Sequence, residues 1–427
     1  MIRPTLLLAT VSLAAFMAGC SASKVGTQAF TTEAASIDES ADPEVASILK
    51  AIEIAPDSPK GYVSLASLYI KRARRTGDFS LNAKAQTAID KARTADPTDL
   101  NARKLSASLD ATFHRFSEAR EAALELEKED PADAFIYGVL TDANAELGNY
   151  DEAVAAAQKM VDLKPNSSSY ARVGHLRSLY GDMKGAVEMF KLAARTADPT
   201  DAEAQSWCLT QLGDEYWKYG KYQDSERSYD EALQISPNYN LAMIGKGRVR
   251  ASQNDLQAAA DILASATNRV PNVEGTILLG DIYQKLGQTE KADAQYALVE
   301  VIEDKLGLNN DKKRLALMWA DHEVKPEQAL EISSREVQLR KDILTADAYA
   351  WALYRNGSFA PAKAAITDAM RLRSNDARTL YHAGMIENAL GNKRDGSRLL
   401  AEALKLNPMF DLIQADNARK VLSQTKQ

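Results

Sequence analysis

Residues 206–239 read SWCLTQLGDEYWKYGKYQDSERSYDEALQISPNY, and the pattern of small and aromatic residues in this stretch decides the fold. Gly213 has no side chain, so a helix around it can lie close to its neighbour, and Gly220 can supply the positive φ of a tight turn. Ala232 permits close packing of a second helix, which Pro237 ends because proline lacks an N–H group. The stretch therefore predicts two packed helices joined by a short turn.

Prolines repeat at the same spacing along most of the chain. The first four in the series are each 34 residues apart, the next two follow after 38 and 34, and the last lies 137 residues further on: Pro97, Pro131, Pro165, Pro199, Pro237, Pro271 and Pro408. The last interval equals four periods plus one residue. Compact, unrelated domains do not produce this spacing, so we expect a linear array of one small unit.

The repeated unit resembles the tetratricopeptide repeat. The stretch carries the signature residues of that family, except that Ser225 stands where alanine is usual: Leu212, Gly213, Tyr216, Gly220, Tyr222, Tyr229, Ala232 and Pro237. Equivalent sets recur from Gly148 to Pro165, from Gly174 to Ala193, from Leu279 to Tyr296 and from Trp351 to Pro408. The resemblance implies an all-α fold, an α-solenoid wound as a right-handed superhelix of about ten helix-turn-helix repeats with capping helices.

Departures from the pattern set the expected boundaries. We expect an N-terminal capping helix at residues 43–58, followed by repeats 1–7 at residues 59–306 and a degenerate repeat at residues 307–342. Repeats 9 and 10 should then occupy residues 343–408, and a C-terminal capping helix residues 409–427. An insertion of about seven residues, somewhere in the region of Arg72 to Asn82, predicts a longer loop between the helices of repeat 1. In repeat 2, His114 stands near the place of the turn glycine.

The N-terminus has the layout of an export signal, because one positive charge precedes an apolar run and small residues lead to Cys20. Met17-Ala18-Gly19-Cys20 resembles the lipobox of bacterial lipoproteins, in which the signal peptidase cuts before a cysteine that carries lipid. The resemblance implies a cleaved signal over residues 1–19 and a flexible tether over 20–42 that begins with lipidated Cys20. Because Ser21 follows, it also favours the outer membrane, facing the periplasm. An ordinary secretory signal with a chance cysteine is the alternative.

Composition argues against nucleic acid and against most catalytic chemistry. A net charge of −7 gives no electrostatic footprint for nucleic acid, and two cysteines and four histidines leave little for a disulfide framework or a metal centre. The sequence contains no Walker loop, nucleophile elbow or HExxH motif. We therefore expect no enzyme, no cofactor and no metal. The alternative of a hidden enzyme rests on a pocket in the degenerate repeat, near Asp321 and His322.

The family resemblance also implies a concave groove and candidate partner-binding residues. In tetratricopeptide repeats the groove-facing side chains fall near the second, fifth, ninth, twelfth and thirteenth positions. That count gives Trp207, Asp214, Trp217 and Lys218 in repeat 5, and Trp351, Tyr354, Arg355, Arg378, Tyr381 and Met385 in repeats 9 and 10. Large aromatic anchors dominate recognition surfaces. The alternative is that irregular repeats bury these rings in packing between neighbours.

These features predict a non-catalytic scaffold, anchored to the bacterial envelope through lipid, that binds peptides or helices of partner proteins. Bacterial lipoproteins with this layout serve envelope assembly or export, and the resemblance implies a role in pilus, secretion, outer-membrane or polysaccharide machinery. An accessory subunit that recruits a cell-envelope enzyme is the alternative from another class.

Overall fold

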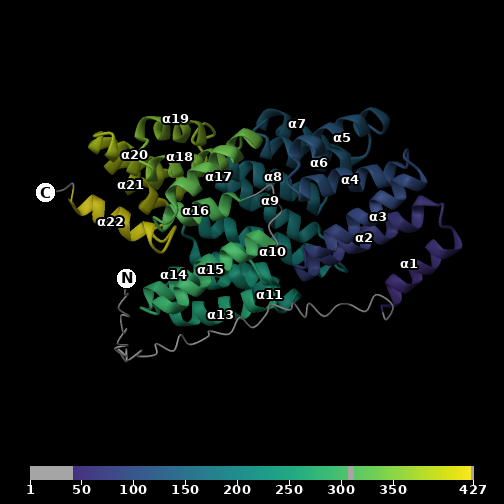
Figure 1. Cartoon of the computed structure of the whole chain (residues 1–427), viewed down its shortest axis with the longest axis horizontal. Coiled ribbons are helices and arrows are strands. Elements are labelled where there is room, and N and C mark those ends of the chain that lie inside the picture. The colour runs from purple at the N-terminus through teal and green to yellow at the C-terminus, as the bar shows by residue number, and fades with distance from the viewer. Residues whose placement is uncertain (1–41, 306–311, 425–427) are drawn as a thin grey trace, which may run out of the picture. The chain divides into compact units, whose positions relative to one another are not determined.

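The computed structural model describes residues 42–305 and 312–424, and every regular element in these ranges is an α-helix (Figure 1). The expected signal over residues 1–19, Cys20 and the tether up to residue 41 lie outside the described residues. The chain divides into two compact units between Ala46 and Ser47, within helix α1 (Pro43–Ile54). All the helices from α2 onward belong to the second unit.

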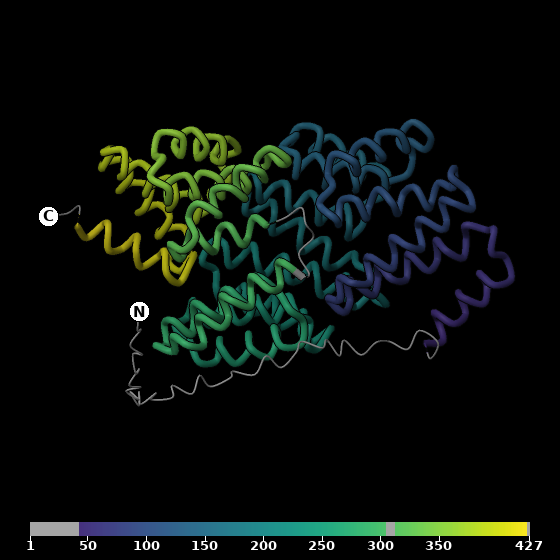
Figure 2. The backbone as a smooth tube through the Cα atoms, in the orientation of Figure 1, coloured from purple at the N-terminus to yellow at the C-terminus, as the bar shows by residue number. Residues whose placement is uncertain are grey.

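Ten consecutive helix pairs make up the array (Figure 2). They are α2 (Pro59–Thr76) and α3 (Ser80–Ala95), α4 (Leu100–Thr112) and α5 (Phe116–Glu129), α6 (Ala134–Glu146) and α7 (Tyr150–Leu163), α8 (Ser167–Leu179) and α9 (Met183–Thr196), α10 (Ala202–Lys218) and α11 (Tyr222–Ile235), α12 (Asn240–Ser252) and α13 (Leu256–Arg269), α14 (Val273–Lys285) and α15 (Thr289–Lys305), α16 (Lys313–Asp321) and α17 (Pro326–Leu339), α18 (Ile343–Arg355) and α19 (Phe359–Ala369), and α20 (Ala377–Ala389) and α21 (Lys393–Leu406). Each pair packs against the next, and α22 (Gln414–Gln424) packs on α21. The predicted all-α solenoid of about ten repeats is confirmed.

Each of the ten repeats joins its two helices by a turn that contains a residue with positive φ. Seven of these residues are glycines, and repeats 2, 6 and 8 use His114, Asn254 and Glu323 at φ of 57°, 64° and 57°. His114 thus takes the place of the turn glycine, as the sequence predicts. The backbone geometry of the turn is therefore kept even where the signature residue is lost.

The expected long loop in repeat 1 is wrong. Helix α2 has 18 residues and continues to Thr76, and α3 already begins at Ser80. The inserted residues therefore lengthen a helix, which satisfies their backbone hydrogen bonds internally, whereas a loop would leave those groups to water.

Repeat 8 is the most irregular of the described repeats. Its first helix, α16, has only nine residues. Trp319 on this helix is buried in a cluster with Val299 of α15 and Ala329 of α17, so the repeat still packs on its neighbour. Residues 306–311, at the start of the expected degenerate unit, lie outside the described residues.

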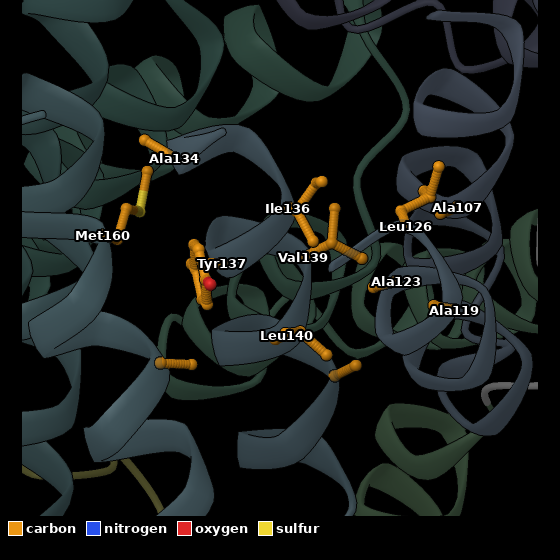
Figure 3. Packing of buried hydrophobic residues seen from close by; sticks show 12 residues of the cluster. Ala107, Ala119, Ala123, Leu126, Ala134, Ile136, Tyr137, Val139, Leu140 and Met160 are labelled. Carbon is orange, nitrogen blue, oxygen red and sulfur yellow. The ribbon is translucent and has the colours of Figure 1, made fainter. Parts of the chain in front are cut away.

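The hydrophobic core is distributed along the array. Figure 3 shows one cluster, in which alanines of α4 and α5 pack with Ile136, Tyr137 and Leu140 of α6 and with Met160 of α7. Helices also approach closely at Gly213, where an added Cβ would lie 2.5 Å from Cε1 of Tyr229. A larger residue at this position would push α10 away from α11, which is the packing reason that the sequence predicts for this glycine.

The array also returns onto itself. Three turn glycines lie against main-chain carbonyl groups far along the sequence, so that an added Cβ would be 2.4 Å from Lys341 O at Gly148, 2.7 Å from Arg373 O at Gly181 and 3.3 Å from Leu406 O at Gly220. At Gly77 an added Cβ would lie 2.6 Å from Cγ1 of Val270. We call these approaches, and the hydrogen bonds beside them, the stacking contacts.

The stacking contacts follow one register. The turns of repeats 1, 3, 4 and 5 meet the loops that precede α14, α18, α20 and α22, which begin units 7, 9, 10 and 11. Each turn therefore meets the loop that precedes the unit six places further on. Hydrogen bonds accompany this register: the Ile343 N–H donates to Tyr150 Oη at 2.8 Å, and the Asn407 side chain donates to Trp217 O at 2.8 Å.

We predict that Gly148→Ala destabilises the protein more than Gly357→Ala does. Both residues have positive φ, 76° and 73°, so both substitutions share a backbone strain of about 1–2 kcal/mol. Only the Cβ at position 148 also meets a carbonyl oxygen, and this overlap should add about 1–3 kcal/mol. Thermal unfolding followed by circular dichroism measures the difference. Equal melting temperatures would contradict a stabilising role for the stacking contacts.

Candidate binding surface

The surface expected on repeat 5 lies on helix α10. Trp217 is half-buried: its Nε1–H donates to Ser252 Oγ of α12 at 2.9 Å, and the Arg248 guanidinium lies 4.4 Å from its ring centroid. Trp207 is also half-buried and contacts the cluster around Tyr229. Both rings therefore join neighbouring repeats while part of each remains accessible.

A ladder of charges crosses three successive first helices. Arg248 of α12 is ion-paired with Asp214 of α10 and, at 2.8 Å, with Glu274 of α14. Tyr229 Oη also donates to Asp214, at 2.6 Å. The side chains of Asp214 and Glu274 keep 39% and 52% of their accessible surface, so the carboxylates are fixed by Arg248 and are still open to a partner.

The pKa values of the two carboxylates in this ladder shift in opposite directions, because burial dominates at Asp214 and nearby positive charges dominate at Glu274. Burial raises the pKa of Asp214, although the positive charge of Arg248 opposes that shift. Burial would also raise the pKa of Glu274, but the charges of Arg248, Arg314 and Arg378 outweigh it and lower the pKa. Three arginines from α12, α16 and α20 thus act on one carboxylate, and Glu274 stays ionised in a neutral solution.

Lys218 points to a different neighbour. Its Nζ lies 3.2 Å from Ser178 Oγ of α8, and that hydroxyl donates to Glu215 Oε2 at 2.6 Å. Burial would raise the pKa of Asp376, but the charge of Lys218 counters it and the pKa is lowered. Lys218 therefore links repeat 4 to the later part of the array, and its observed contacts are internal to the protein.

The second expected patch needs a correction. Trp351 and Tyr381 are 0% exposed and belong to a hydrophobic cluster with Phe410. The Trp351 indole donates to Asp321 Oδ1 at 2.8 Å, and Tyr381 Oη donates to Gln414 Oε1 of α22 at 2.6 Å. The interpretation of these two rings as groove residues is wrong, because the packing between repeats 8, 9 and 10 and the C-terminal helix covers them.

The other four residues of that patch surround the buried rings. Tyr354 stacks on Trp351 with a centroid distance of 4.7 Å, and Arg355 lies 4.4 Å from the same ring and 2.6 Å from Glu323. Arg378 is ion-paired with Asp411 at 3.2 Å and keeps 39% of its side-chain surface. Met385 packs at the border of the cluster. The charge of Arg378 also acts on the ladder, because it is one of those that lower the pKa of Glu274.

The two residues of the hidden-enzyme alternative have structural partners. His322 Nε2 lies 2.7 Å from Asp281 Oδ1 of α14, its Nδ1 lies 2.8 Å from Met318 O, and Asp321 accepts the Trp351 indole. Burial by itself would lower the pKa of His322, but the hydrogen bond to Asp281 and the negative charge there raise it to about 9. The histidine is thus a cation that joins repeats 7 and 8.

The described part of the chain lacks two kinds of feature. Within residues 42–305 and 312–424, no three His, Cys, Asp or Glu side chains gather in a way that could hold a metal ion. None of the helices in these ranges combines the length and apolar character that a membrane span requires.

Sequence reasoning missed Arg248 and Glu274, which hold the ladder together. A signal for both was present, because they occupy the ninth position of repeat 6 and the second position of repeat 7. The choice of candidate residues was guided by tryptophan, which is found at these positions in repeats 5 and 9. When the groove-facing positions are assigned in every repeat, whatever residue occupies them, Arg248 and Glu274 are included.

Comparisons with known proteins agree with the repeat pattern. Two models of the tetratricopeptide repeat match residues 104–168 and 210–273, and residues 277–299. No curated protein matches the sequence.

Among solved structures, the chain is similar to PilW, a widely conserved type IV pilus biogenesis factor, with 18% identity and a TM-score of 0.41 over 49% of this chain and 94% of that one. A human IFIT1 dimer with PPP-AAAA has 14% identity and a TM-score of 0.49, over 85% and 86%. A tetratricopeptide repeat protein from Parabacteroides merdae has 18% identity and a TM-score of 0.35, over 61% and 99%.

We predict that the pair between His322 and Asp281 makes stability depend on pH. The pKa of His322 is raised from 6.5 to about 9, so the stabilisation is fully present below pH 6.5 and is lost as the pH rises through 9. The loss is on the order of 3 kcal/mol. Melting temperatures between pH 6 and 10 measure it, with His322→Gln as the comparison. A wild-type profile as flat as that of the variant would contradict the role of this pair.

Proposed function

Because the chain is a tetratricopeptide repeat protein, we propose that it is a scaffold that binds other proteins and performs no catalysis itself. The observation that carries this proposal is the ladder of Asp214, Arg248 and Glu274, in which Arg248 of α12 fixes two accessible carboxylates, one on α10 and one on α14. Such a surface suits an extended or helical segment of a partner, because the surface runs along the array over several repeats.

The partner-binding surface combines two kinds of group. The half-buried rings of Trp207 and Trp217 offer apolar contact area, and the ladder beside them offers charge. Since Arg248 and its neighbours already hold these groups in place, a partner pays little entropy to order them. A few such preorganised residues supply most of the affinity at protein interfaces.

The proposed location is the bacterial envelope. The support is the sequence Ala18-Gly19-Cys20 after an apolar run, which resembles a lipoprotein signal. Acyl chains on Cys20 would hold the protein on a membrane, since each buried methylene contributes about 0.8 kcal/mol. We place the protein on the outer membrane facing the periplasm, where it would assist an assembly or export machinery.

We predict that Cys20→Ser releases the protein from membranes. Without the thiol no acyl chain can be attached. Both the wild type and the variant are compared with forms in which an ordinary cleavable secretory signal replaces residues 1–19, so that an uncut apolar segment does not hold the variant on the membrane. Fractionation of cells expressing the wild type or the variant measures the distribution, and Cys208→Ser is the matched control because that thiol is buried. Retention of the Cys20→Ser variant in the membrane fraction would contradict the lipid anchor.

We predict that Glu274→Gln weakens the binding of a partner captured by crosslinking in intact cells. A lost charged hydrogen bond costs about 1.5–3 kcal/mol, which corresponds to a loss of roughly tenfold or more in affinity. Titration of the purified pair measures the effect, and Glu402→Gln, on an exposed part of α21, is the control. Unchanged affinity in Glu274→Gln with an unchanged melting temperature would contradict a binding role for the ladder.

A further inference from the structure

In the stacking contacts, turns of early repeats meet loops of late repeats. The turns of the late repeats and the loops of the early repeats have no such contact within the part of the chain that the structure describes, and they form two exposed edges of the array. We define the turn edge as the turns of repeats 7–10, at residues 286–288, 322–325, 356–358 and 390–392. Among the described residues, nothing lies within 4 Å of a Cβ added at Gly287, Gly357 or Gly391. These glycines have φ of 71°, 73° and 88°, close to the 76° and 72° of Gly148 and Gly181, which are covered. The turns of repeats 7, 9 and 10 are therefore formed like the covered turns and remain exposed, and in the turn of repeat 8 residues 323–325 are exposed.

The opposite edge has a matching gap. We define the loop edge as the loops that precede repeats 2–5, at residues 96–99, 130–133, 164–166 and 197–201. In the later half of the array, the corresponding loops bury Asp342, Ser374 and Asn407 at 5%, 6% and 0% exposure against earlier turns. The tips of the earlier loops, such as Pro97, Pro131 and Pro199, are exposed.

We propose that the turn edge of one molecule binds the loop edge of a second copy of this chain, in the register that the chain already uses on itself. The first argument is continuity. Helix α22 packs on α21 as the first helix of an eleventh unit, and the turn of repeat 5 meets the loop before it. A second copy that continues the array would then begin at the twelfth place.

This register fixes which elements meet. With six places between a turn and its loop, the turns of repeats 7, 8, 9 and 10 face the loops before repeats 2, 3, 4 and 5 of the second copy. The contact joins different surfaces of the two molecules, so it is heterologous, and each added copy leaves the same edges free. The assembly therefore extends head to tail.

The second argument is charge complementarity. Three of the four loops are short acidic turns of the form Asp-Pro-x-Asp, at residues 96–99, 130–133 and 198–201. Hydrogen bonds from Thr98 and Thr200 lower the pKa values of Asp96 and Asp198, so both carboxylates stay ionised. Of the turns assigned to these three loops, the turn of repeat 10 is followed directly by two basic residues, Lys393 and Arg394, at the start of α21. In repeat 7, Lys291 stands beside Glu290 at the start of α15, and in repeat 8 Lys325 is ion-paired with Glu300. The charge complementarity is therefore clearest between the turn of repeat 10 and the loop before repeat 5.

The pair formed by the tenth turn and the fifth loop is the sharpest test of the register. Lys393 and Arg394 are exposed at the first residues of α21, and Asp198 and Thr200 are exposed at the tip of their loop. Glutamate is well tolerated at a helix N-terminus, so Lys393→Glu with Arg394→Glu reverses the turn without disturbing the fold. Asp198→Lys with Thr200→Lys reverses the loop and spares Asp201, which caps α10.

Sedimentation velocity of the purified full-length chain, over a wide range of concentration, measures the association. The wild type should form larger species as its concentration rises, and each double variant alone should stay monomeric because like charges then face each other. An equimolar mixture of the two variants should associate again, since the acidic turn of one then meets the basic loop of the other. Circular dichroism of each variant establishes that it is folded.

The matched control reverses two exposed lysines on second helices, Lys159→Glu in α7 with Lys184→Glu in α9, and should associate like the wild type. A wild type that stays monomeric at every concentration would overturn the proposal. Variants that associate as the wild type does, or a mixture that stays monomeric, would equally overturn it. The ladder lies on other residues, so the result is independent of whether Glu274 binds a partner.

Discussion

The close approach between a left-handed turn and a carbonyl group six units further on is the constraint on which the rest of the structure depends. At Gly148 this approach leaves no room for a side chain, because a Cβ would lie 2.4 Å from Lys341 O. Repeats in a solenoid ordinarily touch only their neighbours, so stability is a sum of local terms. Here long-range contacts are added, and repeats 1, 3, 4 and 5 and the later units hold each other in place. A change in the repeat angle anywhere between them would separate the turn from its loop.

This closure explains why so many charged side chains lie between the first helices. When the array returns onto itself, the end of α10 comes near the start of α20, as the effect of Lys218 on Asp376 indicates. Charges brought together in this way must be paired, because an isolated buried charge is costly. Lys218 beside Asp376 meets that requirement where the array returns onto itself, and the ladder of Asp214, Arg248 and Glu274 and the pair of His322 with Asp281 meet it between neighbouring repeats. The same pairing makes the surface rigid, which is favourable for recognition.

The repeat, its turn and the number of units could be predicted from the sequence. They depend on local backbone conformation, which residues such as Gly220 and Pro237 indicate directly. Sequence reasoning failed where the answer depended on distant packing. Trp351 and Trp217 stand in first helices at groove-facing positions of the count, yet α20 and α22 bury the former while Arg248 and Ser252 leave the latter half-open. Gly148 and Gly357 likewise give the same turn signal, and only the fold distinguishes the covered glycine from the exposed one. The ladder was within reach of the sequence, since position alone identifies Arg248 and Glu274.

A solenoid that closes on itself has two separate problems at its boundary, and capping helices answer only one. A terminal helix such as α22 covers the apolar end of the last repeat, through Ala415, Ala418 and Gln414. It does not cover the turns of repeats 7–10, because these turns lie along the side of the array and α22 lies at its end. Polar turn residues keep these edges compatible with water, while their geometry stays that of the turns which dock elsewhere in the same chain. The inner ladder and the outer edges therefore use different residues, so a scaffold of this design can hold a partner and a second copy of itself at the same time.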